Sequence, residues 1–213
     1  MIKAILLDMD GVIIESELAK VEYLKKLFIR YKLQITDKII YTCIGKSVKD
    51  FLSINIPDKL IAEQILSDFF SEYLANITNY AIPIYPTINF IKDNFQKYKL
   101  ALVSNGLKDI NTKILSTYKI SNCFDVILTR ESVTNMKPNP EIYLLALKSL
   151  DIRANECIAI EDSVTGVQAA LSAKIKTYVL KTSYYTKDHF DHFDIEDYID
   201  NINQIKINTY EKQ

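Results

Sequence analysis

The apolar run Ile5-Leu6-Leu7, which leads directly into Asp8-Met9-Asp10-Gly11, constrains the fold more than any other stretch of the chain. Consecutive large aliphatic residues predict a strand with both faces buried, and such strands belong to parallel sheets covered by helices. Because side chains alternate along an extended segment, Asp8 and Asp10 can project to the same side while Met9 turns away. Asp and Gly are also common in plain turns, so this stretch alone leaves a ligand site and a turn both open.

From Pro83 onward, helical patterns alternate with short apolar runs. We expect helices at about residues 86–98, 109–118, 141–150 and 164–174, and strands at about 100–103, 124–129, 157–162 and 177–180. Strands and helices that alternate at this spacing predict right-handed crossovers and a parallel sheet. One further helix is expected at about residues 195–205.

Residues 15–81 have a different pattern, with helical spacing and no strand. A first apolar stripe recurs at steps of three and four through Leu18, Val21, Leu24, Leu27 and Phe28. Two more helical patterns begin after Ser47 and near Pro57. The contrast predicts a helical domain, residues 15–82, inserted into an α/β domain made of residues 1–14 and 83–213.

The composition restricts the classes of partner that we expect. The 213 residues include 26 basic and 27 acidic side chains, without the basic stripe that binding to nucleic acid requires. The first residues lack the features of a signal peptide, and no apolar run reaches the roughly 18 residues needed to span a bilayer. We therefore expect a soluble cytoplasmic protein, a monomer or weak dimer, with neither nucleic acid nor membrane as a partner.

Cysteine and histidine usage argues against two common kinds of site. Cys43, Cys123 and Cys157 are odd in number and show no C-x-x-C spacing, so neither a disulfide framework nor a zinc site is expected. His189 and His192 lack a nucleophile-elbow partner, which argues against a Ser-His-Asp hydrolase.

Two later segments offer groups that can bind a phosphoryl group. Ser104-Asn105-Gly106 follows an apolar run and precedes a helix, so its hydroxyl, amide and backbone N–H groups can cradle anionic oxygens. Taken alone, the same three residues more often form an ordinary turn or helix cap. Lys137 lies between a strand and a helix and is followed by Pro138 and Pro140, which fix φ and stiffen the segment. Most lysines are exposed to solvent, but this stiff segment leads us to expect that Lys137 holds its positive charge in a fixed position.

The segment Ile160-Glu161-Asp162-Ser163 places two adjacent acids directly after an apolar run. Burial of charges without a partner costs several kcal/mol, so Glu161 and Asp162 imply a cation or a protonated carboxyl. Carboxylate oxygens suit Mg²⁺, which fills its remaining positions with water and substrate phosphate. A helix N-cap formed by Asp162 or Ser163 is compatible with this interpretation.

Four acidic residues are candidates for this site: Asp8, Asp10, Glu161 and Asp162. They outnumber the positive charges of Lys137 and Mg²⁺, so we hypothesise that one acid is protonated when a substrate phosphate binds. Asp10 is the natural candidate, because a neutral carboxylic acid can protonate the leaving oxygen and afterwards deprotonate a water. Asp8 would be the nucleophile that forms an aspartyl phosphate. Lys137 and Mg²⁺ would neutralise the phosphoryl oxygens.

In chain order, four motifs resemble those of the haloacid dehalogenase superfamily: Asp8-x-Asp10-Gly-Val, Ser104-Asn105-Gly, Lys137-Pro-x-Pro and Glu161-Asp162-Ser. The helical insertion after the first motif is similar to the cap of the phosphatase and β-phosphoglucomutase-like branch. The resemblance covers the chain to about residue 180. It implies a doubly wound, Rossmann-like core and an all-helical cap domain that closes over the site.

The resemblance also implies roles for individual residues. The metal would be held by Asp8, the backbone oxygen of Asp10 and Asp162, with Glu161 nearby or ligating. The phosphate would be bound by Ser104, Asn105 and Lys137. In the cap, Lys46 falls where relatives present a substrate-facing loop, so it is a candidate for substrate specificity; an exposed lysine beside a helix N-cap is the alternative. Gly45-Lys46-Ser47 is no Walker A motif, because Ile40 stands where glycine is required.

The chain departs from the family pattern at a few positions. Leu7 stands where Phe is frequent, and Glu15 opens the cap in place of Asp. Lys20 stands where many relatives, mutases included, have a histidine, which argues against a mutase. The presence of Asp10 argues against dehalogenation, because a halide leaving group needs no proton.

The resemblance therefore implies a Mg²⁺-dependent phosphatase for a small phosphorylated metabolite: a sugar phosphate, a sugar-acid phosphate or phosphoglycolate. A β-phosphoglucomutase-like mutase and a phosphonate hydrolase with a Schiff-base lysine are alternative enzymes. A phospho-acceptor signalling module, similar to a response-regulator receiver, is the alternative outside enzymes.

Overall fold

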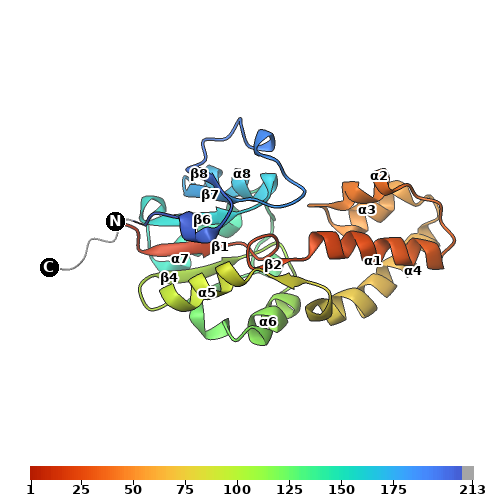
Figure 1. The fold of residues 1–213 in the computed structure, drawn as a ribbon, viewed down its shortest axis with the longest axis horizontal. Coiled ribbons are helices and arrows are strands. Elements are labelled where there is room, and N and C mark those ends of the chain that lie inside the picture. The colour runs from red at the N-terminus through yellow and green to blue at the C-terminus, as the bar shows by residue number, and fades with distance from the viewer. Residues whose placement is uncertain (208–213) are drawn as a thin grey trace. The chain divides into compact units, whose positions relative to one another are not determined.

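The computed structural model describes residues 1–207 (Figure 1). The chain divides into two compact units. The first, called here the sheet unit, comprises Met1–Ile14 and Pro83–Gln213, and the second, the helical unit, comprises Glu15–Ile82. Two short strands at the junctions, β2 (Ile14–Glu15) and β3 (Ile82–Pro83), pair with each other.

The sheet unit is built from alternating strands and helices. Its strands are β1 (Ala4–Leu7), β4 (Lys99–Val103), β5 (Val126–Leu128), β6 (Cys157–Glu161), β7 (Lys176–Leu180) and β8 (Asp197–Ile199). Its helices are α5 (Tyr85–Asn94), α6 (Lys108–Thr117), α7 (Glu141–Leu150) and α8 (Val164–Ser172).

These six strands form one parallel sheet in the order β5-β4-β1-β6-β7-β8. The register places Ile5 of β1 between Leu100 of β4 and Ile158 of β6. From β1 the chain first adds strands on one side and then on the other, so the sheet is doubly wound and Rossmann-like, as the resemblance to the haloacid dehalogenase superfamily implied. The strand order reverses beside β1, and in such sheets this switch point is where ligands bind.

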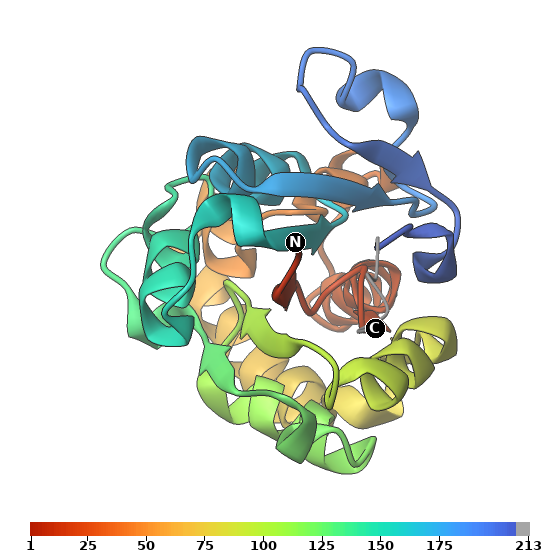
Figure 2. The same cartoon turned by 90° about the vertical axis from the view of Figure 1, so that its left-hand side faces the viewer.

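Alternation along the strands divides the apolar side chains between two covered faces. All four residues of β1 are buried. On one face Ala4 and Leu6 pack with Ala159 of β6 and with the apolar side of α7, which includes Ile142 and Ala146. Small alanines in the strands let the helices approach the sheet closely. Helices lie on both sides of the sheet (Figure 2), which explains why its central strands contain almost only apolar residues.

The helical unit contains α1 (Glu17–Arg30), α2 (Asp37–Ile40), α3 (Val48–Asn55) and α4 (Lys59–Asp68). Polar side chains fix where two of these helices begin: Ser47 Oγ accepts a hydrogen bond from Asp50 N, and Asp58 Oδ1 accepts from Leu60 N. An aromatic cluster, in which Tyr73 stacks with Phe69 and packs beside Tyr23, forms part of the core of this unit.

Two expectations about local structure were wrong or incomplete. No helix spans residues 195–205; instead β8 extends the sheet, and a short 3₁₀ turn at Ile202–Gln204 follows. The long helical pattern after Pro57 ends as α4 at Asp68 and continues as a π turn, Phe69–Tyr73, and a 3₁₀ stretch, Leu74–Asn79. Within residues 1–207, no helix has both the length and the apolar character needed to cross a membrane.

Candidate active site

Three carboxylates meet at the carboxyl ends of two adjacent central strands. Asp8 follows β1, Glu161 is the last residue of β6, and Asp162 comes directly after it. One oxygen from each lies within 4.8 Å of the others, and all three residues are buried, Glu161 completely. The parallel pairing of β1 with β6 makes this convergence unavoidable, because both strands end at the same edge of the sheet.

Lys137 places its ammonium group between two of these acids. Its Nζ donates to Asp8 Oδ1 at 2.7 Å, to Glu161 Oε1 at 2.6 Å and to the backbone oxygen of Val103 at 2.7 Å. Burial by itself would lower the pKa of Lys137, but the charges and hydrogen bonds of Asp8 and Glu161 outweigh burial and raise it. The lysine is therefore charged at neutral pH.

The two adjacent acids carry more negative charge than Lys137 can compensate. Desolvation raises the pKa of Asp162 well above its usual range, and the charges of Asp8 and Glu161 raise it further. Desolvation also raises the pKa of Glu161, against the opposing effect of Lys137. Three buried carboxylates beside one ammonium thus form a site that favours additional positive charge.

Two tyrosines that the sequence analysis did not identify donate to these acids. Tyr143 Oη, on α7, donates to Glu161 Oε1 at 2.5 Å, and Tyr184 Oη, after β7, donates to Asp162 Oδ2 at 2.9 Å. A tyrosine on the apolar stripe of the predicted helix 141–150 was a usable signal, because a buried hydroxyl needs a partner. Tyr184 lies in a connecting segment, where the sequence carries no such signal.

Two glycines make room for the acidic side chains. Gly11 has φ +75°, and a Cβ built on it would lie 2.0 Å from Asp162 Oδ2. A Cβ on Gly166, in the first turn of α8, would lie 1.9 Å from Glu161 Oε2. At both positions the carboxylate occupies the space that any larger residue would fill.

The segment Ser104-Asn105-Gly106 follows β4 and lies beside Lys137. The Asn105 side chain contacts the backbone of Lys137 twice: its Oδ1 accepts from Lys137 N at 3.0 Å, and its Nδ2 donates to Lys137 O at 3.2 Å. Ser104 is buried, and its Oγ accepts from Gly106 N at 2.9 Å. Asn105 thus holds the segment that carries Lys137, and both residues remain predicted phosphate ligands.

The structure places the other two candidate residues outside this carboxylate group. Asp10 is partly buried in the turn after β1, and its side chain is not among the three oxygens that lie within 4.8 Å of one another. Lys46 belongs to the helical unit and is exposed. Its loop is held by Glu17, whose Oε2 accepts from Gly45 N at 2.6 Å and whose carboxylate pairs with Lys20 at 2.6 Å.

The residues present fit a divalent metal ion. Carboxylate oxygens are hard ligands, three of them are close enough to share one ion, and the raised pKa of Asp162 reflects a charge that a cation would compensate. Asp162 lies against Gly11, where a larger side chain would displace it, and Tyr184 Oη donates to its Oδ2 at 2.9 Å. These observations support a site for a divalent metal ion.

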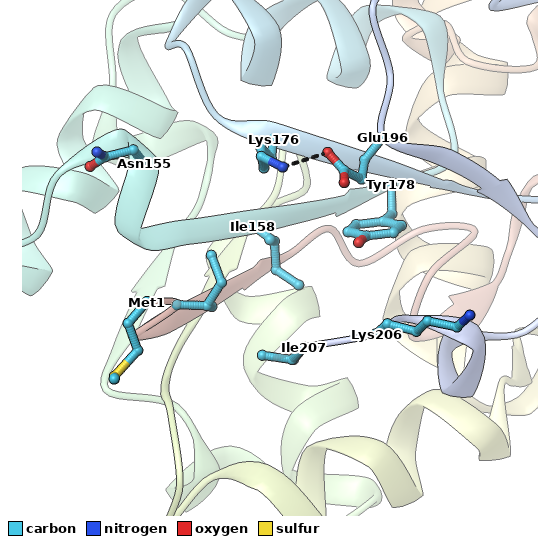
Figure 3. A pocket seen from close by; sticks show the side chains of 9 residues that line it. Met1, Asn155, Ile158, Lys176, Tyr178, Glu196, Lys206 and Ile207 are labelled. Atoms are coloured by element: carbon cyan, nitrogen blue, oxygen red, sulfur yellow. Dashed lines mark hydrogen bonds and ion pairs between the residues drawn. The ribbon is translucent and has the colours of Figure 1, made fainter. Parts of the chain in front are cut away.

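A separate cavity of about 400 Å³ lies at the opposite end of the sheet (Figure 3). It is lined by Ile158 near the start of β6, by Lys176 at the start of β7, and by Tyr178, among others. Lys176 is paired with Glu196 at 2.9 Å, as the dashed line in Figure 3 shows. The cavity is therefore remote from the carboxylates along the strands and belongs to no part of the candidate site.

The comparison with protein families agrees with this geometry. The model of the haloacid dehalogenase-like hydrolases matches residues 5–180, which include the sheet-unit site residues expected from the sequence, whereas Tyr184 lies just beyond the match. The chain belongs to this family. It is accordingly an enzyme, and the carboxyl-end cluster of acids with Lys137 is the candidate active site of a haloacid dehalogenase-like hydrolase.

Curated relatives of this haloacid dehalogenase-like hydrolase are named as phosphatases. Phosphoglycolate phosphatase of Aquifex aeolicus is 30% identical over 190 residues, which cover 85% of this chain and 86% of that protein. Phosphorylated carbohydrates phosphatase of Thermotoga maritima is 28% identical over 185 residues, 82% of each chain. The crystal structure of CbbY from Rhodobacter sphaeroides with phosphate has a TM-score of 0.77 at 22% identity, covers 96% of each chain and shows the shared fold.

Proposed function

We propose that this hydrolase is a Mg²⁺-dependent phosphatase that acts on a small phosphorylated metabolite. The observation that carries the proposal is the position of Lys137 Nζ, 2.7 Å from Asp8 Oδ1 and 2.6 Å from Glu161 Oε1, in a buried cluster that retains excess negative charge. A site that combines a buried ammonium with three carboxylate oxygens close enough to share a divalent cation suits the transfer of a phosphoryl dianion. The names of the curated relatives support the same reaction.

In the proposed reaction Asp8 and Asp10 have complementary roles. Lys137 engages Oδ1 of Asp8, and the carboxylate of Asp8 attacks phosphorus while the bond from phosphorus to the leaving oxygen breaks. Asp10 gives its proton to that oxygen. A water then attacks the aspartyl phosphate and returns a proton to Asp10, so that inorganic phosphate leaves and Asp8 is regenerated.

The metal would be bound by the carboxylates of Asp8 and Asp162 and by the backbone oxygen of Asp10, with Glu161 beside it. When bound, Mg²⁺ would supply positive charge for the phosphoryl oxygens and so lower their repulsion of the Asp8 carboxylate. Ser104 and Asn105 would donate hydrogen bonds to those oxygens from the loop after β4.

The proposed substrates are a sugar phosphate, a sugar-acid phosphate and phosphoglycolate. The named relatives support this range, because one is a phosphatase of phosphorylated carbohydrates and another of phosphoglycolate. Lys46 in the helical unit, proposed as a cap, is the candidate for contacting the part of the substrate distant from phosphorus. Lys46→Ala should then change kcat/KM unequally across these three compounds, whereas a uniform response would remove Lys46 from this role.

The central experiment compares Asp8→Asn with wild type in p-nitrophenyl phosphate and Mg²⁺. Sustained phosphate release is expected from wild type, and a loss of at least about 100-fold from Asp8→Asn, because an amide cannot form the aspartyl phosphate. Asp93→Asn, an exposed acid on α5, is the matched control and should behave as wild type. A folded Asp8→Asn enzyme with substantial turnover would contradict the assignment.

The same preparation distinguishes the alternative functions. A signalling module would release at most one phosphate per chain. A mutase would isomerise a sugar phosphate faster than it releases inorganic phosphate. A phosphonate hydrolase with a Schiff-base lysine would be trapped by borohydride with its aldehyde substrate.

A further inference from the structure

Tyr143 is the buried residue that joins the acid cluster to the helix packed beneath it. It lies on α7, is fully buried, and packs with the apolar core of the sheet unit. Its hydroxyl donates to Glu161 Oε1 at 2.5 Å, and Lys137 Nζ lies 5.2 Å from the centre of its ring. One side chain therefore contacts both members of the Glu161–Lys137 pair.

The Glu161 carboxylate is held from two sides. Oε1 accepts from Tyr143 and from Lys137, which are the two donors that one carboxylate oxygen readily accommodates. On the other side, Oε2 fills the space above Gly166, where a Cβ would lie 1.9 Å away. Oε2 also accepts from Ser163 Oγ at 3.4 Å, so contacts to both oxygens hold the carboxylate where Lys137 reaches it.

The position of Glu161 matters because Lys137 is shared. The same ammonium that donates to Glu161 at 2.6 Å donates to Asp8 at 2.7 Å. Without the Tyr143 hydroxyl, Glu161 Oε1 would lose one of its two donors in a buried site. The oxygen would then attract the Lys137 ammonium more strongly. Because charge-assisted hydrogen bonds are strong where water is excluded, the ammonium would shift toward Glu161 and away from Asp8.

We propose that Tyr143 is a positioning residue, whose hydroxyl fixes Glu161 and thereby keeps Lys137 in contact with Asp8. The proposal rests on the proposed function in so far as Asp8 is the nucleophile. Tyr143 itself touches neither substrate nor the reacting oxygen in this assignment; it acts through the chain Glu161, Lys137, Asp8.

Tyr143→Phe tests the proposal, because it removes the hydroxyl and keeps the ring beside Lys137. We expect kcat for p-nitrophenyl phosphate to fall about tenfold, the usual effect of losing one hydrogen bond to a charged group, while KM stays within about twofold. Tyr198→Phe is the matched control, because Tyr198 in the same unit donates to a backbone oxygen, that of Tyr185, at 3.0 Å. Its kcat should equal that of wild type.

A double-mutant cycle separates positioning from general destabilisation. In a Glu161→Gln background, Tyr143→Phe should lower kcat by less than twofold, because the residue through which it acts has been changed. An equal loss in both backgrounds would show that Tyr143 supports the fold alone and would overturn the proposal.

A spectroscopic measurement tests the geometry without turnover. The ¹⁵Nζ signal of Lys137, assigned by its disappearance in Lys137→Met, should shift in Tyr143→Phe and stay in place in Tyr198→Phe. An unmoved signal together with unchanged kcat would overturn the proposal. If wild type released no phosphate at all, the proposed function would fail, and this signal would still report whether Tyr143 positions Lys137.

Discussion

At the scale of single residues, Lys137 uses every donor that it has. An ammonium group carries three N–H donors, and the three acceptors on Asp8, Glu161 and Val103 lie 2.6 to 2.7 Å away. A phosphoryl oxygen can therefore bind Lys137 only by replacing one of these acceptors or by sharing a donor with it. In the protein without substrate, Lys137 holds the carboxylates of Asp8 and Glu161 next to each other.

Gly166→Ala should destabilise the protein although the change lies in a helix. Alanine in place of glycine ordinarily stabilises a helix by up to about 1 kcal/mol. Here the new Cβ would lie 1.9 Å from Glu161 Oε2, and overpacking of this kind costs about 1 to 3 kcal/mol, so the unfavourable effect should prevail. Urea unfolding measures the difference, with Gln168→Ala on the exposed side of α8 as the control. A more stable Gly166→Ala would show that the Glu161 carboxylate moves easily.

The sequence predicted which residues end the central strands, but not how their side chains pair. An apolar run leads into each of three acids, Asp8, Glu161 and Asp162. Because β1 and β6 are parallel, these acids must lie at the same edge of the sheet. Their roles in a reaction remain predictions. The link between Asn105 and the backbone of Lys137 could not be read from the sequence, because it depends on two loops that meet only in the folded sheet.

At the scale of elements, prediction succeeded where an apolar pattern was long or bounded by clear signals. The helix expected at residues 141–150 is α7, Glu141–Leu150, preceded by Pro140 and ended by Asp151 with φ +52°. Strand β8 was missed because a three-residue edge strand is too short to show a period, and its pairing with β7 is a long-range contact. The π turn at Phe69–Tyr73 keeps helical spacing, so no apolar pattern marks the end of α4 at Asp68.

The link between α1 and the π turn should make the helical unit sensitive to acid. The side chains of Arg30 and Tyr23 donate to Glu72 and lower its pKa from 4.5 to about 2. A depressed pKa in the folded state adds stability above pH 4.5, and this contribution is lost as the pH falls toward 2.

Glu72→Gln should therefore reduce the free energy of unfolding at pH 7 and have a smaller effect at pH 3. Denaturant unfolding at the two pH values gives the comparison. Glu63→Gln, an exposed residue on α4, is the control. A Glu72→Gln penalty of the same size at pH 7 and pH 3 would mean that the Arg30 contact contributes no pH-dependent stability.

At the scale of the whole molecule, the excess charge of the acid cluster should link stability to the metal. A ligand that binds only the folded chain at 100 times its Kd stabilises it by about 2.7 kcal/mol. We expect Mg²⁺ to raise the Tm of wild type and EDTA to lower it. Asp162→Asn should be more stable than wild type in EDTA, because the amide removes the cost of burying an acid beside Asp8 and Glu161, and its Tm should not respond to Mg²⁺.

Calorimetric scans with and without Mg²⁺ provide the measurement. Asp93→Asn should follow wild type in both conditions. An Asp162→Asn protein that still gains stability from Mg²⁺ would place the metal elsewhere.

The junction of the two units also has a practical consequence. The helical unit is one uninterrupted piece of chain, and it leaves and re-enters the sheet unit through β2 and β3, which are paired with each other. Its two ends are therefore neighbours, so residues 15–82 can be exchanged as a cassette between homologous enzymes with only two splice points. On the proposal that Lys46 of the helical unit contacts the substrate, a chimera made in this way should inherit the donor's substrate preference while the host retains its own chemistry.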